Sequence, residues 1–295
     1  MSQYQHLLLI INPALCHSPA ISQAAALAKA SGASLHIAAL IKWWDFLSLL
    51  EEGDRARARA AYLQDHHEWL ASQAASLRAE GLRVTTEVGW SEDMKREILD
   101  HVTVNQPDLL IKEVQHESLL KRALFTPLDW QLLRDCPVPV YLLGAAGPGL
   151  PRKVVAAVDV AASEDDGGAL NDRIVEQATS FATQFGAELH LLYAYDVSQN
   201  YLDEVVNNWT VSELMNARRQ ELQAHYSALA RKFGVTDEHR HSREGHPVAV
   251  ISEFAEEHDV DVIVMGRVQR HGLEKLLGST TEHILYQVPC SVLAV

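Results

Sequence analysis

Uninterrupted apolar runs mark the start of each half of the chain. The runs are Leu7–Ile11 and Val154–Val158, and each ends at a short polar side chain. Short apolar runs without alternation are typical of strands that are buried on both faces. Apolar residues at helical spacing follow in both halves and stop at Gly32 and Gly186, where glycine is expected just past a helix. Each half is therefore predicted to begin with a strand and a helix.

The same order of elements continues in both halves, so the chain repeats itself once. Ala33–Ile37 and Ala187–Leu191 match residue type for residue type and predict a second strand. The remaining predicted elements are helices over 54–80 and 210–233, third strands that end near Gly89 and Gly245, fourth strands over Pro107–Ile111 and Val260–Val264, and fifth strands over Val138–Leu142 and Cys290–Ala294. Strands that alternate with helices form a parallel sheet covered on both faces. The sequence predicts an α/β fold of two tandem, doubly wound, five-stranded, Rossmann-like domains.

A stretch rich in glycine, proline and alanine separates the two copies. Residues 144–151 carry no charge and no periodicity, which is typical of a linker. The predicted division is a first domain over 1–143, a linker over 144–151 and a second domain over 152–295. If Val138–Leu142 pairs with Cys290–Ala294 within one chain, the two domains form an internal pseudo-dimer. Because this pairing uses the edge strands within one chain, the protein would then be a monomer, or a homodimer that forms through other faces.

Composition and charge narrow the class of partner. The chain has 295 residues, enough for about two domains, with 47% hydrophobic residues and a formal net charge of −14. This negative field repels phosphate backbones and anionic lipids, so neither nucleic acid nor a membrane is expected as a partner. The first apolar run is too short for a signal segment, and the three cysteines, Cys16, Cys136 and Cys290, form no CxxC pair. A cytoplasmic location is predicted.

Motifs of catalysis and of metal binding are missing from the sequence. It contains no GxSxG, HExxH, CxxC or complete P-loop pattern, so no catalytic residue is predicted and a binding protein is favoured over an enzyme. The histidine groups at 65–67 and 239–241 lack a third ligand at a suitable spacing, and no metal site is predicted. Asp108 and Asp261 lie at the amino ends of the fourth strands. Parallel sheets bind ligands at the carboxyl ends of their strands, so a structural role is predicted for both residues.

The loop after the fourth strand of the second half is the strongest candidate for a ligand site. It contains Gly266, Gly272 and Gly278, and Ser279 and Thr280 open the last helix. Glycines permit close backbone approach and positive φ, and the two hydroxyl residues combine a helix cap with hydrogen-bond donors. Open parallel sheets bind ligands outside the carboxyl ends of their strands, where the N-termini of helices offer unpaired N–H groups to anions. This loop leaves the carboxyl end of the fourth strand. The pattern therefore predicts a phosphate-binding loop, with an ordinary capped surface loop as the alternative.

The local charge of this loop agrees with an anion site. The loop contains three basic residues, Arg267, Arg270 and Lys275, and one acidic residue, Glu274, although it belongs to the more acidic half of the chain. A basic loop on an acidic domain is what the binding of a phosphate group requires. Arg267 and Arg270 are therefore included among the predicted ligand-binding residues.

Several segments of the second half resemble the nucleotide-binding subfamily of the universal stress proteins. The segments are Val158-Asp159, Glu244–Pro247, the loop that runs from Gly266 to Gly278-Ser279, and the closing strand region Val288–Leu293. The family pattern is G-x2-G-x9-G-[S/T], with an aspartate after the first strand. The resemblance implies that Asp159 contacts the nucleoside of ATP, that Gly266 opens the loop, and that Gly278, Ser279 and Thr280 bind its phosphates. The loop departs from the pattern at Gln269, which replaces the second glycine, and is one residue shorter.

The first half departs further from this pattern. Asn12 replaces the aspartate, and no glycine occurs from Asp108 through Leu143, so the corresponding nucleotide site is predicted to be lost. Phe125–Pro137 resembles the glycine-free loop of the tandem-domain type of the universal stress proteins. The resemblance implies a stress-response protein that binds a small ligand chiefly through its C-terminal domain.

Three other possibilities remain open. Aromatic residues follow the second strand of each half: Trp43, Trp44, Phe46, Tyr193, Tyr195, Tyr201 and Trp209. They could line a cleft for an amphiphilic ligand, but packing of the two halves against each other, or against a protein partner, is favoured. The protein could be a ligand-free interaction scaffold with a vestigial loop. It could also hydrolyse ATP slowly or phosphorylate itself at Ser279 or Thr280.

Overall fold

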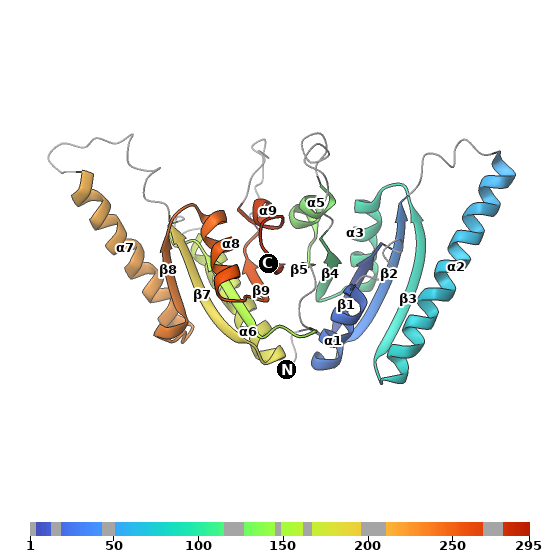
Figure 1. Ribbon diagram of the computed structural model, residues 1–295, viewed down its shortest axis with the longest axis horizontal. Coiled ribbons are helices and arrows are strands. Elements are labelled where there is room, and N and C mark those ends of the chain that lie inside the picture. Colours follow the sequence, from blue (N-terminus) through green and yellow to red (C-terminus); the bar gives the residue numbers. More distant parts are fainter. Residues whose placement is uncertain are drawn as a thin grey trace. The chain divides into compact units, whose positions relative to one another are not determined.

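The chain divides into two compact units, Met1–Leu150 and Pro151–Val295. The computed structural model describes residues 4–12, 19–42, 51–114, 127–144, 149–161, 167–195, 211–267 and 280–295 (Figure 1). Each unit is an α/β domain with five parallel strands.

The described part of the first unit contains five strands and the helices that connect them. Its elements are β1 His6–Ile11, α1 Ala20–Ser31, β2 Ser34–Lys42, α2 Glu52–Ala79, β3 Arg83–Ser91, α3 Met94–Asn105, β4 Leu109–Glu113, α5 Leu128–Asp135 and β5 Val140–Leu143. The strands lie in the order β3-β2-β1-β4-β5, and every pair is parallel. The long helix α2 runs beside β3 (Figure 1).

The second unit repeats this arrangement. Its elements are β6 Lys153–Val158, α6 Gly167–Phe185, β7 Glu188–Tyr195, α7 Val211–Lys232, η3 Asp237–His239, β8 Arg240–Glu244, α8 Pro247–Glu257, β9 Val262–Met265, α9 Thr280–Ile284 and β10 Ser291–Ala294. Its strands lie in the order β8-β7-β6-β9-β10, again all parallel. The predicted doubly wound, Rossmann-like fold with one five-stranded sheet in each half is confirmed.

The central strands form the core of each unit because both faces of the sheet are covered. All residues of Leu7–Ile11, Leu109–Lys112, Val154–Val158 and Val262–Met265 are buried. Parallel sheets bury both faces, which explains why these segments show no alternation of apolar and polar residues. Within the described residues, no helix is both long and apolar enough to cross a membrane.

Glycine ends the first helix of each unit, as predicted. Gly32 has φ 71° and its N–H donates to Ala28 O, while Gly186 has φ 69°. A side chain is strained in this left-handed region, so glycine is the residue that stops the helix without cost.

Strand ends differ from the predictions because pairing with neighbours decides them. The fourth strands begin at Leu109 and Val262, each two residues later than expected, because their pairing with the first strands begins at Leu7 with Leu109 and at Val154 with Val262. The second strand extends past Ile37 to Lys42, because its pairing with β3 continues without a break as far as Lys42 and Ser91. The uninterrupted apolar run Ile37–Ile41 is the local signal of this extension.

Candidate functional site

The candidate site lies where the strand order of the second unit reverses. β6 pairs with β7 on one side and with β9 on the other, so the loops after β6 and β9 leave neighbouring strand ends. This reversal is where open α/β sheets bind ligands. Asp159 follows β6 directly, and Gly266 follows β9. The fold thus brings together two of the residues that the sequence singled out.

Asp159 is held by a pair of hydrogen bonds to the first helix of the unit. Its N–H donates to Asn171 Oδ1 (3.0 Å), and Asn171 Nδ2 donates back to Asp159 O (2.8 Å). Asn171 is buried, so this exchange fixes the backbone at the end of β6. The Asp159 carboxylate is exposed, and its Oδ1 accepts the N–H of Ala161 at 3.0 Å. Asp159 therefore has a fixed backbone and an exposed carboxylate at the carboxyl end of β6.

Gly266 is needed because a helix side chain fills the space beside it. A Cβ at this position would lie 2.8 Å from Cγ and Cδ1 of Leu170 on α6. The expected positive φ is not found at Gly266, which lies outside the left-handed region. Close approach, and not backbone conformation, therefore explains the glycine.

Hydrogen bonds tie the end of β9 to the last helix and to the end of the chain. Thr281 is buried, and its Oγ1 donates to Gly266 O at 2.9 Å. Arg267 is half-buried, and its N–H donates to Val295 O at 2.8 Å, while Val295 N–H donates to Met265 O at 2.9 Å. Both ends of the predicted phosphate loop are thus anchored.

The described residues cover only part of the predicted ligand set. Asp159, Gly266 and Arg267 lie at the strand ends, and Thr280 is the first residue of α9. Arg270, Gly272, Gly278 and Ser279 lie outside the described residues. The site is therefore defined by its two anchored ends.

Tyr193 borders the site on β7. Its side chain is 1% exposed and stacks between the rings of Tyr195 and Tyr226, at centroid distances of 5.6 and 5.8 Å. Burial, and then the nearby Asp159 carboxylate, raises the pKa of the Tyr193 hydroxyl above its usual value. These ring contacts lie within the second unit, whereas the sequence favoured packing between the halves or against a protein partner. Trp43, Trp44, Phe46, Tyr201 and Trp209 lie outside the described residues.

The first unit has a buried ion pair in place of the corresponding contact. Lys112 is the fourth residue of β4, as Met265 is of β9, and Asp129 is the second residue of α5, as Thr281 is of α9. Lys112 Nζ lies 2.8 Å from Asp129 Oδ1, and both side chains are buried. The link between the fourth strand and the last helix is therefore ionic in the first unit and a hydroxyl-to-carbonyl hydrogen bond in the second.

Leu170, Asn171 and Thr281 support the site but were not among the residues predicted from the sequence. Asn171 carried a readable signal, because it stands at helical spacing from the apolar residues Ile174 and Ala178. A polar residue within an apolar helix stripe must find a hydrogen-bond partner in the core. Leu170 and Thr281 act through contacts with residues distant in sequence, and no local pattern marks them.

A sequence profile described as the universal stress protein family matches this chain twice, over residues 3–143 and 151–295. Universal stress protein E of Escherichia coli K12 is 29% identical over 100% of this chain and 95% of its own length. The Universal stress protein E homolog of Haemophilus influenzae is 27% identical over 99% of this chain and 97% of its own length.

Solved structures of full length share the fold. A protein of unknown function from Pseudomonas aeruginosa PAO1 is 28% identical, with a TM-score of 0.74 over 100% of this chain and 93% of the other. A universal stress protein from Archaeoglobus fulgidus is 19% identical, with a TM-score of 0.66 over 99% of this chain and 97% of the other, and it supports the fold alone. Two consecutive copies of one domain are therefore shared with relatives along the whole chain.

Proposed function

The chain belongs to the universal stress protein family as a tandem, Universal stress protein E-like member, and from this premise we propose that its second unit binds an adenine nucleotide such as ATP. The exposed Asp159 carboxylate at the strand-order reversal is the observation that carries the proposal. Its backbone is fixed by Asn171, so the carboxylate can accept hydrogen bonds from ribose hydroxyls without a further loss of backbone freedom.

The phosphate end of the ligand is assigned to the loop between β9 and α9. Arg267 and Arg270 supply positive charge, and Gly272, Gly278, Ser279 and Thr280 supply backbone N–H groups and hydroxyls. The contact between Gly266 and Leu170 supports this assignment, because it holds the start of the loop against α6. The proposed role is that of a stress-response protein that binds a small ligand in the cytoplasm. The buried thiols of Cys136 and Cys290 agree with a reducing compartment.

Native mass spectrometry of the gently purified protein, with and without added ATP, tests the proposal. The expected result is an adduct of ATP or ADP mass that Asp159→Asn weakens and Gly278→Asp abolishes. Asp159→Asn keeps an oxygen for the Ala161 N–H and removes the charge, so it tests ligand contact more than folding. Asn12→Ala in the first unit is the matched control and should leave the adduct unchanged.

Other outcomes separate the remaining possibilities. A bare chain that ignores added ATP would overturn the proposal and favour an interaction scaffold. An adduct with an acyl chain would overturn it in favour of an amphiphile. Phosphate release that is equal in wild type and in Ser279→Ala would exclude ATP hydrolysis through that hydroxyl, and equal incorporation of phosphate into the two proteins would exclude autophosphorylation there.

A further inference from the structure

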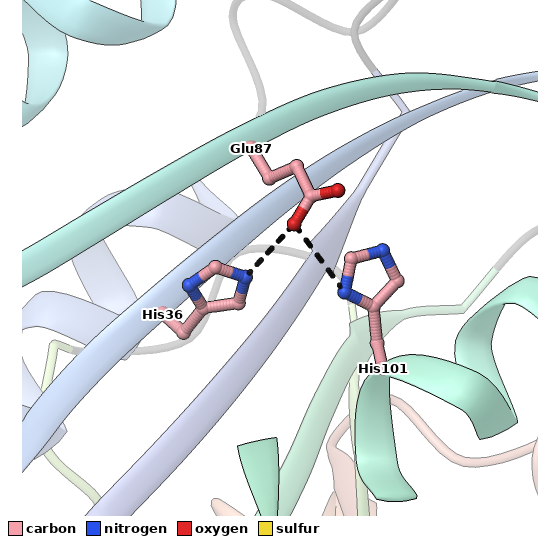
Figure 2. Close-up of side chains that lie close together, drawn as sticks. All are labelled: His36, Glu87 and His101. Carbon is pink, nitrogen blue, oxygen red and sulfur yellow. Dashed lines mark ion pairs between the residues drawn. The ribbon is translucent and has the colours of Figure 1, made fainter. Parts of the chain in front are cut away.

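Three metal-ligating side chains converge in the first unit, away from the strand-end site. His36 lies on β2, Glu87 on β3 and His101 on α3, and Figure 2 shows the two imidazole rings on either side of the carboxylate. Glu87 Oε2 lies 3.9 Å from His36 Nε2 and 3.9 Å from His101 Nδ1. One ligand atom from each residue lies within 4.8 Å of the other two.

The separations are too long for direct hydrogen bonds and suit a shared central ion. A hydrogen bond between nitrogen and oxygen needs about 2.7–3.2 Å, so 3.9 Å leaves a gap between the groups. Ligand atoms around a tetrahedral zinc ion stand about 3.4 Å apart, given bonds of about 2.0–2.2 Å. The Glu87 carboxylate is the exposed member of the group and can close this small difference.

Neighbouring groups leave the correct nitrogen of His36 available. His36 Nδ1 lies 2.8 Å from Thr85 Oγ1, so Nδ1 carries the proton when it donates to that hydroxyl. Nε2 then has a lone pair, and it is buried without a hydrogen-bond partner among the described residues. A ligating histidine characteristically uses its second nitrogen in this way, to fix the orientation of the ring.

His101 has a carboxylate on the far side of its ring. Its side chain is 7% exposed, and its Nε2 lies 3.9 Å from Glu97 Oε1, too far for a direct hydrogen bond, while Nδ1 faces Glu87. The Glu97 carboxylate therefore adds negative charge near the proposed cation but does not fix the ring as Thr85 fixes His36. The centroids of the His101 and His36 rings lie 5.9 Å apart.

We propose that His36 Nε2, Glu87 Oε2 and His101 Nδ1 bind one divalent transition-metal ion, with zinc as the best fit. Two imidazole nitrogens and one carboxylate oxygen form a ligand set that zinc accepts, and a water molecule completes the tetrahedron. No metal site was predicted from the sequence, because these three residues come from separate elements and share no short spacing.

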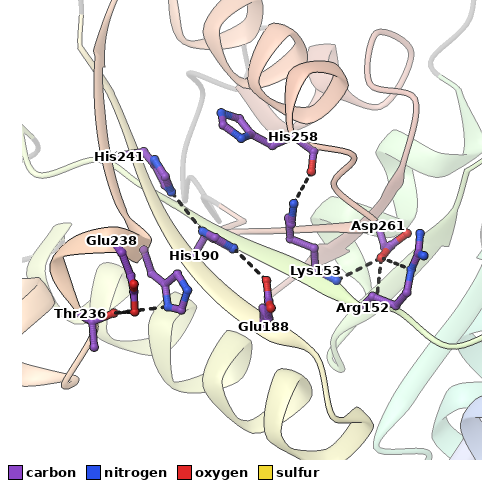
Figure 3. Close-up of polar contacts among 10 residues, drawn as sticks. Arg152, Lys153, Glu188, His190, Thr236, Glu238, His241, His258 and Asp261 are labelled. Carbon is purple, nitrogen blue, oxygen red and sulfur yellow. Dashed lines mark hydrogen bonds and ion pairs between the residues drawn. The ribbon is translucent and has the colours of Figure 1, made fainter.

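The second unit also has one glutamate and two histidines close together, but they come from different elements: two lie on β7 and one in η3, and none lies on a helix equivalent to α3. These residues are Glu188, His190 and His239. His190 Nδ1 is 3.1 Å from His241 Nε2, so one imidazole faces another where Glu87 faces His36 in the first unit (Figure 3). Phe254 stands eight residues after the N-cap of α8, as His101 does after that of α3. Phenylalanine cannot ligate, so the proposal is restricted to the first unit.

Equilibrium dialysis of the full chain against zinc, followed by elemental analysis, tests the site. Wild type should retain one equivalent, and His101→Phe, which copies Phe254, should lose it. Glu87→Gln changes an exposed side chain, and it should also lose the equivalent while keeping the wild-type circular dichroism spectrum. His190→Gln in the second unit is the matched control and should retain the ion.

Cobalt(II) provides a second readout through its visible absorption. A tetrahedral site with nitrogen and oxygen ligands gives intense bands, which should appear in wild type and in His190→Gln and be absent from Glu87→Gln. The proposal is overturned if wild type retains no zinc, or if a folded Glu87→Gln protein retains as much as wild type. It is also overturned if His190→Gln alone removes the ion.

Discussion

The carboxylates of Asp108 and Asp261 make the same contacts in the two units. Asp108 Oδ2 accepts the N–H groups of Gln5 (2.7 Å) and His6 (2.8 Å). Asp261 Oδ2 accepts those of Arg152 (2.7 Å) and Lys153 (3.0 Å), as Figure 3 shows. Each carboxylate thus caps the amino end of the first strand from the start of the fourth, which confirms the structural role predicted for both.

Loss of this cap should destabilise the second unit. Asp261→Ala leaves two N–H groups at the sheet edge without their charged acceptor, and hydrogen bonds to charged groups contribute about 1.5–3 kcal/mol. We expect the free energy of unfolding, measured by urea denaturation, to fall by about 2 kcal/mol. Asp237→Ala removes a carboxylate that is 93% exposed, and a change beyond about 0.5 kcal/mol in that control would argue against the explanation.

The buried pair Lys112 and Asp129 should behave as a coupled unit. Lys112→Met or Asp129→Thr alone leaves the other charge buried without its partner, and each should cost about 3–5 kcal/mol. The double variant reproduces Met265 and Thr281 of the second unit and should recover most of the loss. Trp130 fluorescence during urea denaturation reports the transition. Additive losses in the double variant would show that the pair is not coupled.

The close approach of Gly266 and Leu170 predicts a compensating pair of substitutions. Gly266→Ala places a methyl group 2.8 Å from the Leu170 side chain, so overpacking should cost about 1–3 kcal/mol. Adding Leu170→Ala should relieve the clash, so that the second substitution costs less in the variant background than in wild type. Gly168→Ala on the same helix meets no atom within 4 Å and serves as the control. Thermal unfolding of wild type, the Gly266→Ala and Leu170→Ala variants, the double variant and the Gly168→Ala control measures the effect.

His241 should remain neutral in mildly acidic solution. Burial, followed by the nearby His190, His258 and Arg243, lowers the pKa of His241 to about 4. Because this pKa lies below the unfolded value of about 6.5, the unfolded chain binds more protons between these two pH values. The contribution of His241 to stability is therefore fully present above about pH 6.5 and is lost as pH falls towards 4.

Histidine-selective NMR measures this shift directly. The resonance assigned by its loss in His241→Gln should titrate near pH 4, well below model imidazole. In urea denaturation, His241→Gln should lose less stability than wild type between pH 7 and pH 5, whereas replacing the exposed His225 should not change the loss. A midpoint near pH 6.5 for His241 would contradict the structure.

The order of strands and helices followed from the sequence because each element carries its own signal. Buried parallel strands are apolar without alternation, and glycine can take the left-handed conformation that ends a helix, so Leu7–Ile11 and Gly32 could be interpreted without a structure. The duplication made every such signal visible twice. Asp159 and Gly266 were identified in this way, because strand ends determine where a ligand edge lies.

Tertiary structure alone decided which distant side chains meet. The contacts of Leu170 with Gly266, of Lys112 with Asp129, and of Glu87 with His36 and His101 join side chains from different elements. Only the structure shows that close approach, and not positive φ, accounts for Gly266. Local patterns specify elements, because they reflect the period of a strand or helix. The pairing of side chains depends on packing between elements, and no single segment encodes it.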